Sequence, residues 1–241
     1  MARNGTSGAV AERGNRILQA LDPHDRVELE ARLAAVFLKV KTVLYEPGEP
    51  VDSVCFPIDA VISLVTPLED GAIVEVATVG NEGLVGVPAV PGGAFAVRAI
   101  TQVAGRALTM GISPFLDSIK RTPPLAALVD RYVQALFGQI SQAAACNRLH
   151  SNEERLSRWL LMSHDRVGVD SFLITQEFLG QMLGSRRATV TLSAGILQRA
   201  GLIRYHRGHV EIVNRDGLEA TACECYQVIQ SELSRVTPAL A

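Results

Sequence analysis

The sequence predicts an α+β protein of three parts: an N-terminal antiparallel β-roll of the jelly-roll type, a long dimerisation helix and a C-terminal winged helix–turn–helix. Three observations predict this class. Apolar residues recur at a period of two between residues 39 and 104, a helical period begins after Pro123-Pro124, and two short helical stretches precede a β-prone hairpin at residues 174–213. The predicted boundaries are an arm at 1–22, a sensor roll at 23–113, the long helix at 114–149, the winged domain at 150–214 and a last helix at 215–241.

The charge is distributed unevenly along the chain. The 241 residues carry a net charge of −2 and are 48% hydrophobic, which is ample for one or two packed domains. Residues 27–112 hold ten acidic and five basic side chains, a net charge of −5, whereas residues 174–212 hold five arginines against two glutamates, a net charge of +3. An acidic part joined to a basic part indicates that one part senses a signal and the other contacts a polyanion.

Cysteine usage favours a reduced, intracellular setting. Cys55, Cys146, Cys223 and Cys225 form no C-x-x-C pair and no disulfide framework. The pair Cys223-x-Cys225 has the alternative interpretation of half a metal or redox site, but it is isolated in the sequence, and we predict no metal. No apolar run reaches the roughly 18 residues of a membrane span, and the N-terminus lacks the apolar core of a signal peptide. We therefore expect a cytoplasmic protein without a membrane partner.

The apolar residues of the N-terminal half have first a helical spacing and then a spacing typical of β-strands. Residues 1 to about 15 are small and polar, and we expect them to be mobile. Helical spacing predicts helices at 15–21 and 23–37, with Asp22 as a cap and Pro23 as the first helical residue. Short β-prone runs separated by turn residues follow at 40–45, 53–56, 61–66, 73–79 and 97–104. Their spacing predicts an antiparallel barrel or jelly roll, whose mouth has room for a small ligand.

A helix of about 25 residues is predicted after Pro123-Pro124, because apolar side chains there form a wide helical stripe. The stripe comprises Leu125, Leu128, Val129, Tyr132, Val133, Leu136, Phe137, Ile140 and Ala144. Six of them, Leu125, Leu128, Val129, Tyr132, Leu136 and Ile140, are assigned to the dimer helix. The stripe is wide enough to pack on the roll and on a second copy of the chain, so we predict a dimer helix, with a purely intramolecular role as the alternative. Ser151 to Glu154 then form a capping box that begins the packing base of the winged domain. A last helix at 216–236 has no assigned role.

The winged domain is predicted from capping and turn signals. Thr175 is a good N-cap for a first helix, Gly184 ends that helix, and Ser185 is expected to cap a second helix at about 186–200. Val190, Ile196 and Leu197 are expected to face the core, with Gly201 in the left-handed conformation after the helix. Two β-prone runs around Arg207-Gly208 predict a hairpin wing.

Two arginines begin the second helix of this domain, and this position indicates a ligand. Arg186 and Arg187 oppose the helix dipole there. Cations are easier to explain at this end if a phosphate or a guanine edge binds to them; a solvated basic face is the alternative. The predicted contacts to double-stranded DNA are Thr175, Gln176, Arg186, Arg187, Ala188, Thr189, Thr191, Leu192, Arg204 and Arg207.

Several stretches of the sequence match the motifs of a known protein family. They are residues 44–58 and 97–101 in the roll, and residues 174–177, Gly180, Gln181, Gly184, Arg187, Thr189, Val190 and residues 201–203 in the winged domain. With these stretches in this order, the chain resembles the Crp/Fnr family of bacterial transcription regulators over nearly its whole length. The resemblance implies a cyclic-nucleotide-binding-like β-roll, a homodimer on an inverted-repeat DNA site, and contact with RNA polymerase.

The resemblance also implies roles for single residues. Arg187 matches an arginine that reads guanine in the catabolite-activator branch, Thr189 matches a hydroxyl that holds phosphate, and Gln176 falls where the first helix meets the DNA backbone. Ala188 and Leu192 depart from that branch, because they replace a glutamate and a second arginine that read bases. A half-site of different sequence is therefore expected.

The effector loop departs further from the family pattern. The candidate pocket residues are Gly80, Asn81, Glu82, Gly83 and Arg98. Glu82 is a candidate for the ribose contact, but the next arginine is Arg98, which aligns with a later, structural position, and a phosphate without a charged partner is poorly held. We therefore predict no cofactor, with a cyclic nucleotide as the weaker alternative, and an effector of unknown identity. The N-terminal part has no cysteine cluster for an iron–sulfur centre, and for haem Cys55 is the one conceivable ligand, because residues 39–149 contain no histidine.

Two other classes of function are alternatives to a DNA-binding regulator. A cupin-like enzyme needs two or three histidines in the roll, and the five histidines are His24, His150, His164, His206 and His209. None of them lies within the strands of the predicted roll, so we expect no enzyme. A small-molecule sensor that acts through protein partners is the second alternative; DNA binding differs from it by a steep dependence on salt.

Overall fold

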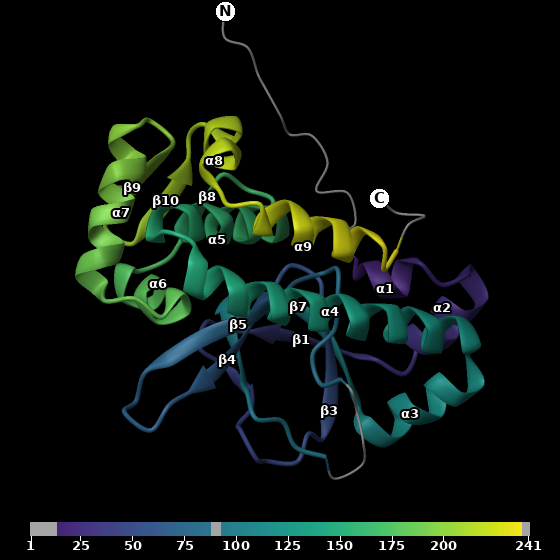
Figure 1. Ribbon diagram of the computed structural model, residues 1–241. Helices are drawn as coiled ribbons and strands as arrows, with labels where there is room; N and C mark the ends of the chain where they lie inside the picture. Colours follow the sequence, from purple (N-terminus) through teal and green to yellow (C-terminus); the bar gives the residue numbers. More distant parts are fainter. Residues whose placement is uncertain (1–13, 88–92, 238–241) are drawn as a thin grey trace, which may run out of the picture.

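The computed structural model describes residues 14–87 and 93–237. The expected mobility of residues 1–13 and the predicted turn at Pro91-Gly92 fall outside these ranges. The described chain forms a β-roll, a long helix across it and a winged helix–turn–helix at one end (Figure 1). Among the described helices, none is long and apolar enough to cross a membrane.

Two short helices precede the roll: α1 (Arg16–Gln19) and α2 (Pro23–Glu30). Asp22 caps α2 as predicted, since its side chain accepts from the backbone N–H groups of His24 and Asp25. The predicted extension of this helix to residue 37 is wrong, because the chain turns after Glu30 and forms β1 (Ala34–Leu38). β1 pairs with a strand that is far away in the sequence, and the local sequence carries no signal of this pairing. The pairing stabilises an extended conformation there despite the helical spacing of the apolar residues.

The roll consists of two antiparallel sheets. One has the order β1-β7-β3 and the other the order β2-β6-β4-β5. The remaining strands of these sheets are β2 (Val43–Tyr45), β3 (Ser53–Pro57), β4 (Val61–Pro67), β5 (Ile73–Val79), β6 (Arg98–Val103) and β7 (Gly105–Gly111). The predicted antiparallel roll is confirmed, although β1 and β7 were not among the predicted runs. β7 is central to its sheet, because it pairs with β1 on one side and β3 on the other.

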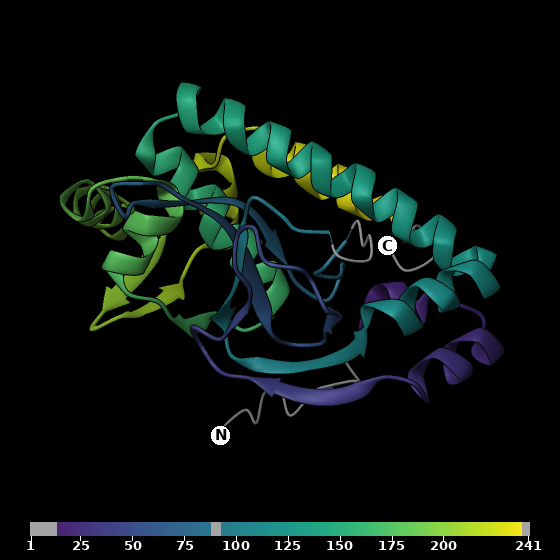
Figure 2. The ribbon, with the colours of Figure 1, turned by 90° about the horizontal axis from the view of Figure 1, so that it is seen from below.

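After α3 (Ile112–Arg121), the long helix α4 (Pro123–Leu149) crosses the roll (Figure 2). Most of the predicted stripe on α4 is buried within this one chain. Leu125, Leu128, Val129, Tyr132 and Leu136 are between 0% and 8% exposed, whereas Ile140 is half-buried. These five side chains therefore pack within the chain, and the predicted contact of this helix with a second copy stays a prediction.

The winged domain contains α5 (Asn152–Val167), β8 (Ser171–Leu173), α6 (Gln176–Leu183), α7 (Arg187–Arg199), β9 (Ile203–His206) and β10 (His209–Ile212). The wing is a three-stranded antiparallel sheet of order β8-β10-β9. The capping box of Ser151 and Glu154 is confirmed, and so is the left-handed Gly201, with φ +73°. Two expectations are wrong. Ile196 is 44% exposed, and Ser185 does not cap α7, because its hydroxyl donates to Asn152 Oδ1 over 2.6 Å.

The predicted last helix is in fact two helices, α8 (Arg215–Thr221) and α9 (Cys225–Ser234). Helix α9 lies along α4 in the opposite direction (Figure 1). Near the start of α9, Gln142 Nε2 donates to Cys225 Sγ over 3.1 Å. Beyond its end, Arg131 Nε donates to the carbonyl of Val236 over 3.2 Å. The C-terminal segment thus covers one side of the long helix.

A buried polar network joins the roll to α5. Trp159 Nε1 of α5 donates to Glu75 Oε1 of β5 over 2.9 Å, and Thr78 Oγ1 donates to the same oxygen over 2.8 Å. Gln102 Nε2 of β6 donates to Ser163 Oγ of α5 over 3.0 Å. Burial raises the pKa of Glu75, and its hydrogen bonds and the charge of Arg158 only partly oppose that shift. The roll and the winged domain are therefore held together by polar contacts that exclude water.

The raised pKa of Glu75 predicts a pH-dependent stability. The folded protein holds a proton on Glu75 at pH values where the unfolded chain has released it. This contribution is therefore complete below the unfolded pKa and is lost as pH rises through the folded one. In Glu75→Gln the group cannot ionise, so the melting temperature of the variant relative to wild type should rise as the pH increases above the ordinary range of a glutamate pKa. Differential scanning calorimetry at several pH values measures this trend. The exposed Glu69→Gln is the control, and an equally flat trend in both variants would contradict the assignment.

Candidate nucleic-acid interface

A tight turn between α6 and α7 sets the geometry of the helix–turn–helix. Gly184 ends α6 in the left-handed conformation, with φ +56°, which glycine adopts without steric cost. Gly180 lets the turn approach closely, because a Cβ there would lie 2.9 Å from the carbonyl oxygen of Ser185. Thr175 caps α6 as predicted, through a hydrogen bond from the backbone N–H of Phe178 over 3.1 Å. The two helices are thereby locked in one relative orientation.

Helix α7 presents one face to the core and one to solvent. Val190, Ser193, Ala194 and Leu197 are buried. The opposite face carries the exposed side chains of Arg187, Ala188, Thr191 and Leu192, and Thr189 beside them is half-buried. Leu192 is 69% exposed, a costly position for an isolated apolar side chain. This face therefore has the composition of a surface that meets a partner.

The start of α7 combines two features that favour an anion. Arg186 is the N-cap and Arg187 the first helical residue, and within the described chain no side chain caps this end. The free backbone N–H groups and the positive end of the helix dipole thus lie beside two guanidinium groups. Helix N-termini of this kind bind phosphate.

Residues from three elements meet at one concave surface. Thr175 and Gln176 of α6, Arg187 of α7 and Arg207 of the wing line a cavity of about 390 Å³, together with Tyr205, His206 and Gly208. Thr191 ties α7 to α6, because its hydroxyl lies 2.8 Å from Gln176 Oε1. Arg204 lies apart from this group of lining residues and forms an ion pair with Glu211. The structure thus brings together four of the residues predicted to contact DNA.

The wing turn holds an arginine in an unfavourable backbone conformation. Arg207 has φ +47° and Gly208 φ +81°, as in the type I′ turns of two-residue hairpins. Asparagine or glycine fits the first position with less strain, so an arginine there indicates a role for its exposed charge. Tyr205 anchors the wing, since its hydroxyl donates to the carbonyl of Ile174 over 2.7 Å. Burial raises the pKa of Tyr205 to about 12, which keeps this donor protonated.

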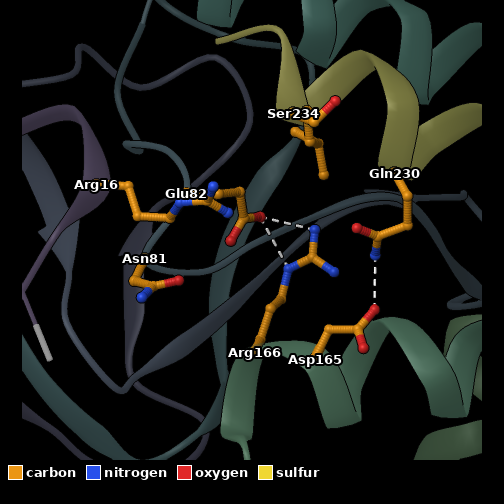
Figure 3. A pocket seen from close by; sticks show the side chains of 8 residues that line it. Arg16, Asn81, Glu82, Asp165, Arg166, Gln230 and Ser234 are labelled. Atoms are coloured by element: carbon orange, nitrogen blue, oxygen red, sulfur yellow. Dashed lines mark hydrogen bonds and ion pairs between the residues drawn. The ribbon is translucent and has the colours of Figure 1, made fainter. Parts of the chain in front are cut away.

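The candidate effector loop is filled by the protein itself (Figure 3). Glu82 is only 7% exposed, and its carboxylate forms an ion pair of 2.7 Å with Arg166 Nη2 from α5. Arg166 Nε donates to the same carboxylate over 2.9 Å, and the backbone N–H of Gly80 donates to it over 3.1 Å. One oxygen of the group proposed for the ribose contact, Glu82 Oε1, therefore already has three partners within the protein.

Among the described residues, the space beside this loop is small. A Cβ on Gly83 would lie 2.2 Å from the ring of Tyr132, so α4 packs directly on the loop. The cavity lined by Asn81, Glu82 and Arg166 measures about 80 Å³, whereas ligand pockets usually measure about 300–1,000 Å³. Arg98 is not brought to the loop, because it pairs with Glu46 over 2.7 Å. Of the five residues predicted to form the effector pocket, Gly80, Asn81, Glu82 and Gly83 therefore lie together in the loop, and Arg98 lies elsewhere.

Cys55, the conceivable haem ligand, lies buried in β3. Burial raises the pKa of its thiol to about 12. A haem thiolate requires the deprotonated form, so this environment disfavours ligation by Cys55.

Comparison with known proteins agrees with this geometry. The family model of the Crp-like helix-turn-helix domain matches residues 154–221. No curated protein sequence matches the chain. The structure of FixK2 from Bradyrhizobium japonicum has a TM-score of 0.69 at 15% identity, over 79% of this chain and 98% of FixK2.

Two further solved structures share the fold. The c-di-GMP-responsive global regulator CLP of Xanthomonas campestris has a TM-score of 0.65 at 14% identity, over 79% of this chain and 99% of CLP. A CRP-family transcriptional regulator from Thermus thermophilus, TTHB099, has a TM-score of 0.64 at 20% identity, over 78% of this chain and 96% of TTHB099. The chain therefore has the fold of Crp/Fnr regulators, which are transcription regulators and not enzymes.

The buried pair of Arg166 and Glu82 predicts a strong destabilisation when one partner is removed. Arg166→Met should lower the free energy of unfolding by about 3–5 kcal/mol, because it removes the cation that pairs with a buried carboxylate. The double variant Arg166→Met/Glu82→Gln should recover part of that loss, and urea unfolding measures both. Arg106→Met is the control, since its pair with Asp59 is largely exposed and should contribute less than about 1 kcal/mol. Equal losses in Arg166→Met and Arg106→Met would contradict the prediction.

Proposed function

Because residues 154–221 match the Crp-like helix-turn-helix domain within a Crp/Fnr-type fold, we propose that this protein is a transcription regulator that binds an inverted-repeat DNA site as a homodimer. The observation that carries the proposal is the cationic start of α7. Arg186 and Arg187 stand there at a free helix N-terminus, and Arg187 shares one cavity with Arg207 of the wing.

The exposed face of α7 suits a major groove. Arg187 offers the planar fork that binds guanine O6 and N7. Ala188 and Leu192 offer apolar contact to thymine methyl groups and no hydrogen bond. Gln176, Thr189 and Arg207 lie at the edges of this face, where phosphates would pass. We therefore expect a half-site that contains a guanine opposite Arg187 and A·T pairs opposite the two apolar side chains.

Arg187→Ala should weaken binding to the selected DNA site by about 1–3 kcal/mol and relax specificity at one base position. The physical reason is the loss of a two-pronged hydrogen bond to one guanine. Fluorescence anisotropy on the selected duplex measures the affinity, and a repeated selection measures the preference. Arg199→Ala is the matched control, because Arg199 is exposed at the other end of α7. An unchanged base preference in Arg187→Ala would refute this role.

A second copy fits an apolar seam that forms the more exposed side of the predicted stripe on α4. Val133, Phe137, Ile140 and Ala144 recur at spacings of four, three and four residues, the pattern of a coiled-coil seam. Phe137 is 72% exposed. Arg131 and Gln142, which contact the C-terminal segment, lie on a different side of the helix. Two α4 helices paired along this seam would set two copies of α7 about one helical turn of DNA apart.

Phe137→Glu should convert the dimer to a monomer, because it introduces a charge at the centre of the proposed seam. Sedimentation velocity measures the change, and binding to the inverted repeat should fall with it. Phe37→Glu is the matched control, since Phe37 is 67% exposed on β1, away from α4. A variant Phe137→Glu that remains dimeric would exclude this seam.

We further propose that the roll is a degenerate effector domain, which works without a cyclic nucleotide. The ion pair of Glu82 with Arg166 and the packing of Tyr132 on Gly83 support this. RNA polymerase is the proposed protein partner and the cytoplasm the proposed location. An effector of other chemistry stays open, and a sensor that acts only through protein partners is the alternative.

The whole proposal is tested by selection of random duplex DNA with the purified protein, without ligand, at two salt concentrations. Enrichment of an inverted repeat supports a homodimer that is active without an effector. Salt-sensitive binding without enrichment would indicate that the roll needs an effector. Absence of any DNA binding at low salt would overturn the proposal in favour of the protein-partner alternative.

A further inference from the structure

Three of the four cysteines, which are far apart in sequence, meet beside a histidine. Cys146 and His150 belong to the end of α4, where His150 is the C-cap, and Cys223 and Cys225 belong to the junction of α8 and α9. One ligand atom from each residue lies within 4.8 Å of every other. Three thiol sulfurs and one imidazole nitrogen are thus gathered at one point.

The distances fit the edges of a metal tetrahedron. Zinc–sulfur bonds of about 2.3 Å and zinc–nitrogen bonds of about 2.0–2.1 Å imply sulfur–sulfur edges near 3.8 Å and sulfur–nitrogen edges near 3.6 Å. Cys146 Sγ lies 3.5 Å from Cys223 Sγ, and Cys225 Sγ lies 3.4 Å from His150 Nδ1. The other pairs of ligand atoms lie within 4.8 Å of each other, so small movements of the side chains would bring these four atoms into zinc geometry.

The histidine has the outer partner that metal-bound histidines usually have. His150 Nε2 lies 3.2 Å from Glu224 Oε2, so this nitrogen can donate its proton to the carboxylate. That leaves Nδ1, the nitrogen that faces Cys225, free to accept a metal bond. Three cysteines packed only as apolar side chains would explain neither the imidazole at sulfur distance nor its carboxylate partner.

The charged side chains around the cluster also suit a metal site. Zinc bound by three thiolates and a neutral imidazole carries one net negative charge. Arg155 and Arg158 of α5 are 7% and 6% exposed, and the Nε atom of each has no hydrogen-bond partner within the described chain. Both arginines lie close enough to Cys146 to interact with its charge. Gln142 Nε2 adds a hydrogen bond to Cys225 Sγ over 3.1 Å.

We propose that Cys146, His150, Cys223 and Cys225 form a Cys₃His site for zinc or a similar thiophilic divalent cation. The three sulfurs are buried, with their residues at most 4% exposed, as in structural rather than catalytic zinc sites. The site lies where the long helix ends and α5 begins. A metal there would fasten the start of α9 to the corner between α4 and the winged domain. The proposal does not rest on DNA binding.

The sequence alone does not reveal this site, because its two halves lie more than 70 residues apart. In the sequence, Cys223-x-Cys225 is an isolated pair. The signal for the other half is the spacing of Cys146 and His150, since residues four apart lie on the same face of a helix.

The test uses the full chain without a histidine tag, purified under reducing conditions, with metal content measured by mass spectrometry. We expect about one zinc per chain, as one Cys₃His site binds one ion. The double variant Cys223→Ser/Cys225→Ser should lose it. Cys55→Ser should keep it, because Cys55 is a buried cysteine of the roll outside the cluster. Equal zinc in the double variant and the wild type would overturn the proposal.

Cobalt titration of the chelator-stripped wild-type protein decides the question even if the variants fold poorly. Tetrahedral cobalt with three thiolates should give intense visible bands and thiolate-to-cobalt charge transfer, and zinc should then displace the cobalt. Glu224→Gln should weaken zinc binding by about 10- to 100-fold, whereas Glu232→Gln, later on the same helix, should not. A reduced wild-type protein without these bands would overturn the proposal, and so would a metal-free protein with a Cys146–Cys223 disulfide.

Discussion

The contact on which the rest of the structure depends is the buried ion pair between Glu82 of the roll and Arg166 of α5. Removing two charges from water is costly, and the cost is offset only where further hydrogen bonds satisfy both groups. Here Gly80 donates to the carboxylate, and the guanidinium donates to the carbonyls of Met162 and Thr78. The same pair joins the loop at residues 80–83 to α5, on which α6 and α7 are built.

The long helix α4 has three sides with different surroundings. One side packs on the roll, where Tyr132 contacts Gly83 and Gln139 donates to the carbonyl of Thr78. A second side carries the C-terminal segment, held by Arg131 and Gln142. The third side exposes Phe137. A proposed dimer contact and the proposed metal site therefore use different sides of one helix, and neither blocks the other.

The winged domain has charged side chains on its surface and hydrogen bonds beneath them that hold its elements together. Tyr205 and Thr191 hold the wing and the two helices together through hydrogen bonds. Arg187 and Arg207 stay exposed above them. The proposed contact with DNA would therefore need no rearrangement of the backbone, which lowers the entropic cost of binding. The proposed metal site would extend this rigidity to the corner behind α5.

The sequence by itself determined the features that depend on neighbours within about four residues: the caps at Asp22, Ser151 and Thr175, the turn at Gly184, the wing at Arg207-Gly208, and the change of period that separates the roll from the helices. Only the tertiary structure decided which side of α4 is buried, that β1 replaces the end of a helix, that Arg166 fills the effector loop, and that Cys146 meets Cys223. The physical reason is that these contacts join residues far apart in sequence. Their free energy comes from packing and burial in the folded chain, and a local pattern carries no record of the distant partner.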